Sequence, residues 1–154
     1  MTPEEVAGQI EQAIEAPERG PMGEALLEAA PAFCDAIERN FAAAVDEGGM
    51  PWPAHAPLTV ALYGPHPLLI LSGKMLAAAT EKAAPGHVER LADDGRTLEM
   101  GIDGGVIDYA WQHQRGTERI PRRQFIYVDD RGQEEIAEDL ISPLTMQLFG
   151  EPGK

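Results

Sequence analysis

The histidines are the first side chains to consider for chemistry, because histidine is a common metal ligand and general base. There are four, at positions 55, 66, 87 and 113, and consecutive ones are at least 11 residues apart. None of these intervals places two ligands on one helical turn or strand. His55 and His66 lie in a proline-rich stretch, where a histidine is ordinarily solvated or locally hydrogen-bonded. We therefore expect no metal site.

Two side chains are candidate nucleophiles, Ser72 and Cys34. Ser72 lies in Leu-Ser-Gly-Lys, which lacks the Gly-x-Ser-x-Gly pattern of a nucleophile elbow. Cys34 is the only cysteine, which excludes an intrachain disulfide and a multi-cysteine zinc site, and its place on an apolar stripe predicts a buried core residue. Gly101–Gly105 lacks the Gly-Lys-Ser/Thr of a phosphate-binding loop, so we expect a strand end and turn there. The sequence predicts neither an enzyme nor a bound cofactor.

Most neighbouring carboxylates occur where turns or helix starts are expected, so we interpret them as caps. These pairs are Asp93 with Asp94, Asp129 with Asp130, and Glu134 with Glu135. The segment 115–123 is different, because it carries four arginines and one glutamate. Two interpretations remain open for it, a solvated loop and a contact patch for an acidic partner surface.

Length and charge limit the classes of function. The chain has 154 residues, which fits a single domain, and a formal net charge of −14. Such acidity argues against stable binding to nucleic acid. No apolar run approaches the roughly 20 residues of a membrane helix, and the acidic N-terminus is unlike a secretory signal. We expect no membrane association and a cytoplasmic location.

Hydrophobic spacing predicts helices in the first third of the chain. A short acidic helix is expected to begin at Thr2 and end before Pro17. Its apolar positions are Val6, Ile10, Ala13 and Ile14. With the following linker it makes residues 1–20 an extension and 21–154 a single domain. The main helix is expected to begin with Pro31 in its first turn and to end at Gly48-Gly49. Its apolar stripe runs through Leu26, Ala30, Phe33, Cys34, Ile37, Phe41 and Val45.

A small antiparallel sheet is predicted after a proline-rich loop at residues 50–67 that Trp52 holds in place. Residues 75–79 fit a helix or a strand equally well. Strands are expected near 87–91 and 98–102, joined by the turn Asp93-Asp94-Gly95, and a third at 119–128.

A short helical turn is expected at 108–114, ending at Gly116. A last helix should follow Asp129-Asp130 with a kink at Pro143. Its expected face is Ile136, Leu140, Ile141, Leu144 and Leu148. The predicted fold class is α+β, with a long helix from the N-terminal half and a C-terminal helix packed on the small sheet.

Four motifs in order resemble the virion-morphogenesis, or tail-completion, family of Mu-like phages. The helix from Phe33 to Gly48-Gly49 is followed by Pro51-Trp52-Pro53, and later come Ile70–Leu76, Tyr109–Gly116 and Ile120–Phe125. The resemblance covers about residues 33–142. Arg123 and Gln124 stand where that family usually shows Arg and Pro, and residues 1–30 have no counterpart.

The resemblance implies a non-enzymatic structural protein that forms a ring at the tail or head–tail junction, first in the host cytoplasm and then in the virion. Its implied partners are other virion proteins, namely the tail tube, neck or connector, and further copies of itself. The candidate motif and interface residues are Trp52, Pro53, Ser72, Gly73, Tyr109, His113, Gln114, Gly116, Arg119, Pro121, Arg122 and Phe125.

Other interpretations compete with a virion role. The chain could be a small cytosolic protein-binding module that shares only the fold, or a hydrolase that uses a carboxylate or His113. A plainer role for His113 and Gln114 is to hold a turn through hydrogen bonds to the backbone. The acidity also suggests that a ring of this protein would repel passing DNA.

Overall fold

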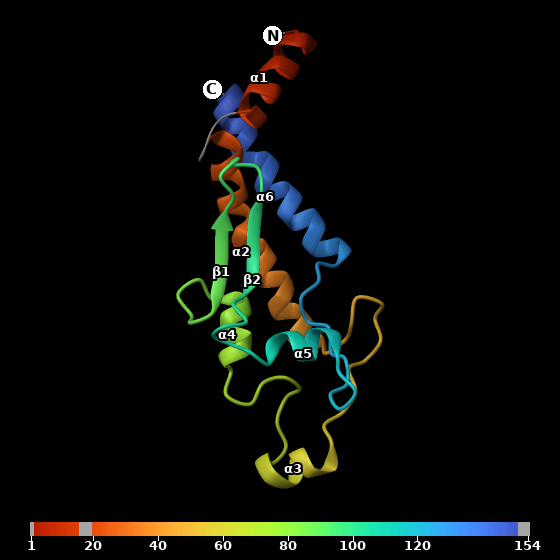
Figure 1. Ribbon diagram of the computed structural model, residues 1–154. Coiled ribbons are helices and arrows are strands. Elements are labelled where there is room, and N and C mark those ends of the chain that lie inside the picture. The colour runs from red at the N-terminus through yellow and green to blue at the C-terminus, as the bar shows by residue number, and fades with distance from the viewer. Residues whose placement is uncertain (1, 16–19, 151–154) are drawn as a thin grey trace. The chain divides into compact units, whose positions relative to one another are not determined.

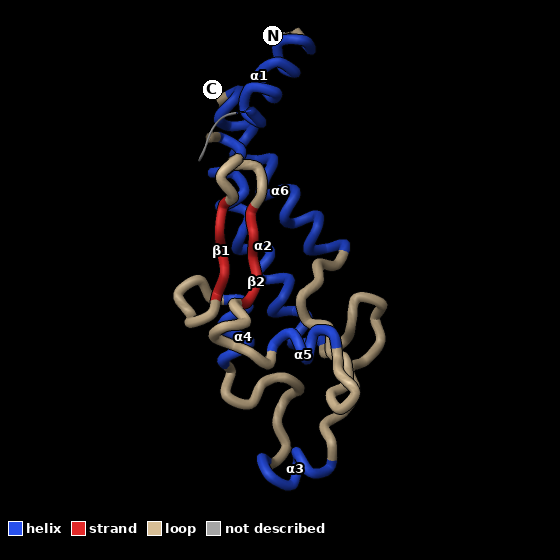
Figure 2. Tube along the Cα trace, in the orientation of Figure 1, coloured by secondary structure: helices blue, strands red, loops and turns tan. Residues whose placement is uncertain are grey.

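The computed structural model describes residues 2–15 and 20–150, in which six helices and a two-stranded sheet occur (Figure 1, Figure 2). The helices are α1 (Pro3–Glu15), α2 (Pro21–Ala43), α3 (Pro57–Tyr63), α4 (Lys74–Thr80), α5 (Ala110–Arg115) and α6 (Asp130–Phe149), and the strands are β1 (His87–Leu91) and β2 (Leu98–Ile102). The predicted α+β class is confirmed, including the long helix and the C-terminal helix that pack on the antiparallel sheet.

The chain divides into two compact units. The first contains the chain up to Phe33, Glu89–Met100 and the residues from Arg131 onward, and the second contains Cys34–Val88 and Gly101–Asp130. Helix α2 and both strands contribute residues to each unit. The predicted boundary at residue 20 directly follows residues 16–19, which lie outside the described residues.

In the first unit, a β-hairpin lies against the start of α2. The turn has the predicted sequence, with Gly95 at φ 66° and the carboxylate of Asp94 accepting the backbone N–H of Arg96 at 2.9 Å. A Cβ on Gly23 would lie 2.8 Å from a methyl group of Leu91. Glycine therefore allows the close approach of helix and hairpin. Along the same part of α2, Ala25, Ala29 and Ala30 are buried.

Helix α1 begins with a reciprocal pair of hydrogen bonds. The Thr2 hydroxyl accepts the backbone N–H of Glu5 at 3.2 Å, and the Glu5 carboxylate accepts that of Thr2 at 2.7 Å. This capping box agrees with the predicted start, and the end at Glu15 agrees with the expected stop before Pro17. The predicted face formed by Ile10, Ala13 and Ile14 lies outside the described side chains.

The second unit has an aromatic core that joins α2 to two later segments. The ring of Phe41 lies 5.3 Å from that of Phe125 and 6.0 Å from that of Trp52, measured between centroids. Phe125 and Ile37 are fully buried. The ambiguous segment 75–79 is helical in α4, and α5 ends at Gly116 as predicted.

Both predicted ends of the main helix are wrong. Helix α2 begins at Pro21 and continues through Pro31. Proline is tolerated at the first position of a helix, because the backbone N–H of that residue would have no partner within the helix. An exposed proline removes one hydrogen bond, and the buried alanines on either side of Pro31 hold the helix together. The helix stops before Ala44, which has φ 53°, because Trp52 donates its backbone N–H to the Ala44 carbonyl at 2.8 Å. Gly48-Gly49 instead forms the turn that follows.

Other expectations need smaller corrections. Cys34 is half-buried, because the buried face of α2 passes through Ile37 and Asn40 instead. The proline-rich stretch contains helix α3, whose first residue is Pro57, a position that tolerates proline. Helix α6 runs through Pro143, and Ile141 is exposed whereas Ile136, Leu140 and Leu144 are half-buried. Leu148 lies outside the described side chains.

Candidate functional site

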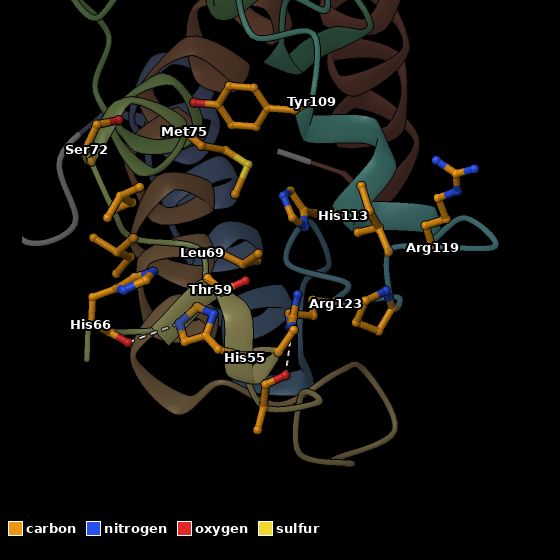
Figure 3. Close-up of a pocket in the computed structure, with 17 residues that line it drawn as sticks. His55, Thr59, His66, Leu69, Ser72, Met75, Tyr109, His113, Arg119 and Arg123 are labelled. Atoms are coloured by element: carbon orange, nitrogen blue, oxygen red, sulfur yellow. Dashed lines mark hydrogen bonds between the residues drawn. The ribbon is translucent and has the colours of Figure 1, made fainter. Parts of the chain in front are cut away.

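A pocket of about 580 Å³ lies within the second unit (Figure 3). One wall comes from the chain around α3 and the start of α4, including His55, His66, Leu69 and Met75. The other wall comes from α5 and the segment after it. Six predicted site residues line the pocket, namely Ser72, Gly73, Tyr109, His113, Arg119 and Pro121. The other six are not among the lining residues, namely Trp52, Pro53, Gln114, Gly116, Arg122 and Phe125.

The predicted strand at 119–128, which builds part of this wall, is not formed: residues 119–120 are a bend and 121–128 have no regular secondary structure. Among the described residues no neighbouring strand binds its backbone; side chains do so, together with the His113 carbonyl, which accepts the N–H of Arg123. Asn40 donates its amide N–H groups to the carbonyls of Phe125 at 2.9 Å and Tyr127 at 2.8 Å. The indole N–H of Trp52 donates to the Gln124 carbonyl at 3.0 Å. The segment therefore has its backbone groups satisfied as a strand would, but no partner strand lies beside it among the described residues.

Gln114 binds the same segment from the other side. Its amide oxygen accepts the backbone N–H groups of Phe125 at 3.0 Å and Ile126 at 2.9 Å, and its amide nitrogen donates to the Ile126 carbonyl at 2.9 Å. The prediction that Gln114 holds the backbone is confirmed. We call Asn40, Trp52 and Gln114 the side-chain clamp.

Gly116 brings the end of α5 close to the returning chain. It has φ 77°, and a Cβ there would lie 2.9 Å from the backbone nitrogen of Arg122. Any side chain would therefore clash with the backbone. The turn that follows carries exposed Arg119 and Arg122, and Arg122 donates to the amide oxygen of Gln124 at 3.1 Å.

His113 lies on the wall of the pocket, next to Tyr109, with ring centroids 6.3 Å apart (Figure 3). Its backbone carbonyl accepts the N–H of Arg123 at 2.7 Å. Its ring nitrogen Nδ1 is buried and has no hydrogen-bond partner among the described residues, so a backbone-holding role for the ring is not observed. Burial, and then the positive charge of Arg123, lowers the pKa of His113 below 6.5, which favours a neutral ring at pH 7.

The first two histidines form a pair in the opposite wall. Their ring centroids are 4.2 Å apart, the Nε2 of His55 lies 3.1 Å from the His66 carbonyl, and the Nδ1 of His66 lies 2.9 Å from the Gly64 carbonyl. The prediction of local hydrogen bonding for these residues is confirmed. These contacts fix the shape of the loop beside α3.

The arrangement offers little for nucleophilic catalysis. The Ser72 hydroxyl accepts the backbone N–H of Lys74 at 3.4 Å, and within the described chain no basic side chain is hydrogen-bonded to it. A serine nucleophile needs such a base. Within residues 2–15 and 20–150, no group of three or more His, Cys, Asp or Glu side chains is placed to hold a metal ion.

Arg123 is a feature of the site that the sequence analysis did not single out from its arginine-rich segment. Its side chain is only 6% exposed, and it donates from Nε to the Pro53 carbonyl at 2.8 Å and from Nη2 to the Ala54 carbonyl at 2.9 Å. These bonds join the loop that precedes α3 to the segment after α5. Burial lowers the pKa of Arg123, yet a guanidinium remains charged at pH 7.

A second feature is an exposed apolar segment inside the proline-rich stretch, which the sequence analysis expected to be interface material but not to form a helix. Between Glu47 and Lys74 the chain has no Asp, Glu, Lys or Arg, and this charge-free run was the available signal. No residue of α3 is buried. The exposed fractions of Leu58, Leu62 and Tyr63 are 68%, 66% and 60%. We call residues 57–63 the apolar projection.

Comparison with family models, with curated proteins and with solved structures finds no match for the chain. No helix within residues 2–15 and 20–150 is both long and apolar enough to span a membrane. What the site can bind therefore has to follow from its own residues.

Proposed function

We propose that this protein is a non-enzymatic structural component that assembles with copies of itself into a ring completing the tail or head–tail junction of a phage or prophage particle. The order of the four motifs between residues 33 and 142 supports this proposal. The location follows from it, with assembly in the host cytoplasm and then residence in the virion. Its partners are other virion proteins of the tail tube, neck or connector.

The observation that carries the proposal is the apolar projection. Large exposed apolar patches on soluble proteins mark interaction surfaces, because water contact with them is unfavourable. Leu58, Leu62 and Tyr63 are exposed on the short helix α3, and none of them contributes to the core. In a closed ring, each subunit presents such a surface to a different surface of its neighbour.

The exposed arginines of the segment 115–123 suit a second contact. Arg119 and Arg122 lie at the surface of a chain with net charge −14, so an acidic surface on a neighbouring copy would attract them. Trp52 and Phe125 have a different role in the proposal. They are core residues of the subunit, and they support the interface without forming it.

The test is electron microscopy of induced lysates from the strain that carries the gene. Deletion should give full heads with separate or over-long tails, and the wild-type gene should restore joined particles. The double variant Leu58→Ser/Leu62→Ser should fold, because neither side chain is buried, but should not restore joining. Ile141→Ser is the matched control, because Ile141 is 60% exposed and lies in the first unit.

Two results would count against the proposal. Full restoration by the double variant would show that the apolar projection is not the assembly contact. Normal particles after deletion would remove the virion role altogether and favour the protein-binding module, which predicts a stable complex with one host protein. Thermal unfolding of each variant would separate loss of contact from loss of fold.

A further inference from the structure

The guanidinium of Arg123 is a buried charge that has no counter-charge among the described residues. Among residues 2–15 and 20–150, no carboxylate forms an ion pair with it, and its side-chain partners are the carbonyls of Pro53 and Ala54. Carbonyl groups satisfy donors but bring no negative charge. Buried charges in proteins are normally paired, because removing an ion from water is costly. Arg123 is therefore an electrostatically incomplete site.

The bonds of Arg123 leave one edge of its guanidinium unused. The group has five N–H donors in a plane, and the two carbonyls take the Nε–H and one Nη2–H. The remaining Nη1 and Nη2 donors form the end-on edge, which matches the two oxygens of a carboxylate. Arg123 also lines the pocket (Figure 3).

The rest of the pocket fits an anion with an apolar body. Within the described part of the chain no aspartate or glutamate lines it, although the full sequence has 26 of them. Its ionisable groups are two arginines, three histidines and a tyrosine, and its remaining walls include Leu69, Ile70, Met75 and Ile120. A volume near 580 Å³ lies within the range of small-ligand sites.

One backbone feature of the pocket points the same way. Leu69 lines it with φ 63°, in the left-handed region that residues with a Cβ seldom adopt. Such conformations are concentrated at ligand-binding and functional sites, because the surrounding structure must hold them. Here the strained backbone keeps an apolar side chain on the wall opposite Arg123.

We infer that this pocket binds a small organic acid, whose carboxylate pairs with the end-on edge of Arg123 and whose apolar body lies against Leu69, Met75 and Ile120. A monocarboxylate fits better than a phosphate, because a dianion needs more donors than a single partly used guanidinium in an apolar pocket provides. This inference goes beyond the proposed structural role and does not depend on it.

The test compares two probes of equal shape on the full-length protein, hexanoate and hexanamide. Titration at pH 7, followed by two-dimensional NMR of the Arg123 side chain and the His113 ring, which both line the pocket, should show saturable binding of hexanoate. Hexanamide should bind at least about tenfold more weakly, because it carries no charge. Acetate should also bind more weakly than hexanoate, because it lacks the apolar body.

Arg123→Lys keeps the charge but loses the planar edge, and should weaken hexanoate binding at least about tenfold. Arg122→Lys is its matched control, because Arg122 is on the same segment but does not line the pocket. If Arg123→Lys does not fold, the two probes on the wild-type protein still decide the question.

Three outcomes would overturn the inference. They are equal binding of hexanoate and hexanamide, no saturable binding of hexanoate, and hexanoate binding that falls as the protein self-associates. The last would show that a carboxylate of a second copy fills the site. None of them bears on the particle phenotype of the deletion, so the failure of this inference is distinguishable from failure of the proposed function.

Discussion

At the scale of single residues, His113 and Arg123 illustrate how burial changes ordinary side chains. They belong to different secondary-structure contexts, yet the His113 carbonyl accepts the Arg123 N–H at 2.7 Å and both side chains line the same pocket. Burial of the ring, and then the positive charge of Arg123, disfavour a protonated His113. A histidine that the sequence presents as a candidate base is thus held mainly in its neutral form.

The lowered pKa of His113 predicts a loss of stability in mild acid. In the unfolded chain the ring has its ordinary pKa near 6.5, so below that pH the unfolded state binds more protons than the folded state. The contribution of the neutral ring is present above pH 6.5 and is lost as pH falls through the lower, folded-state pKa. The free energy of unfolding of the wild type should therefore fall more between pH 7 and pH 5 than that of His113→Gln.

Urea unfolding of both proteins at several pH values measures this difference. The carboxylates are the same in both proteins, so their titration affects both pH profiles equally and does not contribute to the difference. Parallel pH profiles for wild type and variant would contradict a lowered pKa of His113.

At the scale of elements, the segment 119–128 is held in place by hydrogen bonds although it belongs to no sheet. Its backbone donors and acceptors bind the amides of Asn40 and Gln114 and the indole of Trp52, all at 2.8–3.0 Å. Asn40 is only 3% exposed, so water cannot readily replace its bonds. The side-chain clamp thus stabilises this segment where a strand would normally be bound by its neighbour.

The clamp predicts that its two amides tolerate a change to a carboxylate unequally. Asn40 uses only its donors, so Asn40→Asp places an anion against two carbonyl oxygens and should cost about 3 kcal/mol or more. Gln114→Glu keeps both accepting bonds and loses one donating bond, which should cost about 1–2 kcal/mol. Chemical unfolding at pH 7 measures both values. An equal cost, or a greater one for Gln114→Glu, would mean that the amides do not hold the segment in this way.

At the scale of the whole molecule, charge and apolar surface are separated along the chain. The first 50 residues contain 11 acidic and 2 basic residues, whereas the run from Gly48 to Gly73 contains no Asp, Glu, Lys or Arg. A net charge of −14 keeps copies apart, and a charge-free apolar projection is where they can approach at the lowest electrostatic cost.

The net charge predicts that salt stabilises this protein. Raising NaCl from about 10 mM to about 150 mM shortens the screening length from about 30 Å to about 8 Å, which weakens repulsion among the excess carboxylates. The thermal midpoint, measured by circular dichroism, should rise. KCl at equal ionic strength is the control and should have the same effect. A midpoint that falls with salt would show that attractive ion pairs outweigh the repulsion.

Local patterns were enough to predict much of the fold. The hairpin with Asp93-Asp94-Gly95, the strands at 87–91 and 98–102, the short helix that ends at Gly116 and the α+β class all follow from spacing and turn residues. These features depend on neighbours close in sequence, through alternation and through a glycine with positive φ. The holding role of Gln114 was also predicted.

Long-range contacts decided the rest. The segment 119–128 has residues that favour a strand, such as Phe125 and Tyr127, but Asn40, more than 80 residues earlier, supplies the hydrogen bonds of both. Helix α2 passes Pro31 because burial on both sides offsets one lost bond. Arg123 is one of four arginines in the segment 115–123, and the sequence does not distinguish it from the others. The tertiary packing buries Arg123 and places no carboxylate of the described residues beside it. Sequence by itself determined the local elements through nearest-neighbour preferences, whereas the tertiary structure decided which polar groups are buried and what they bind.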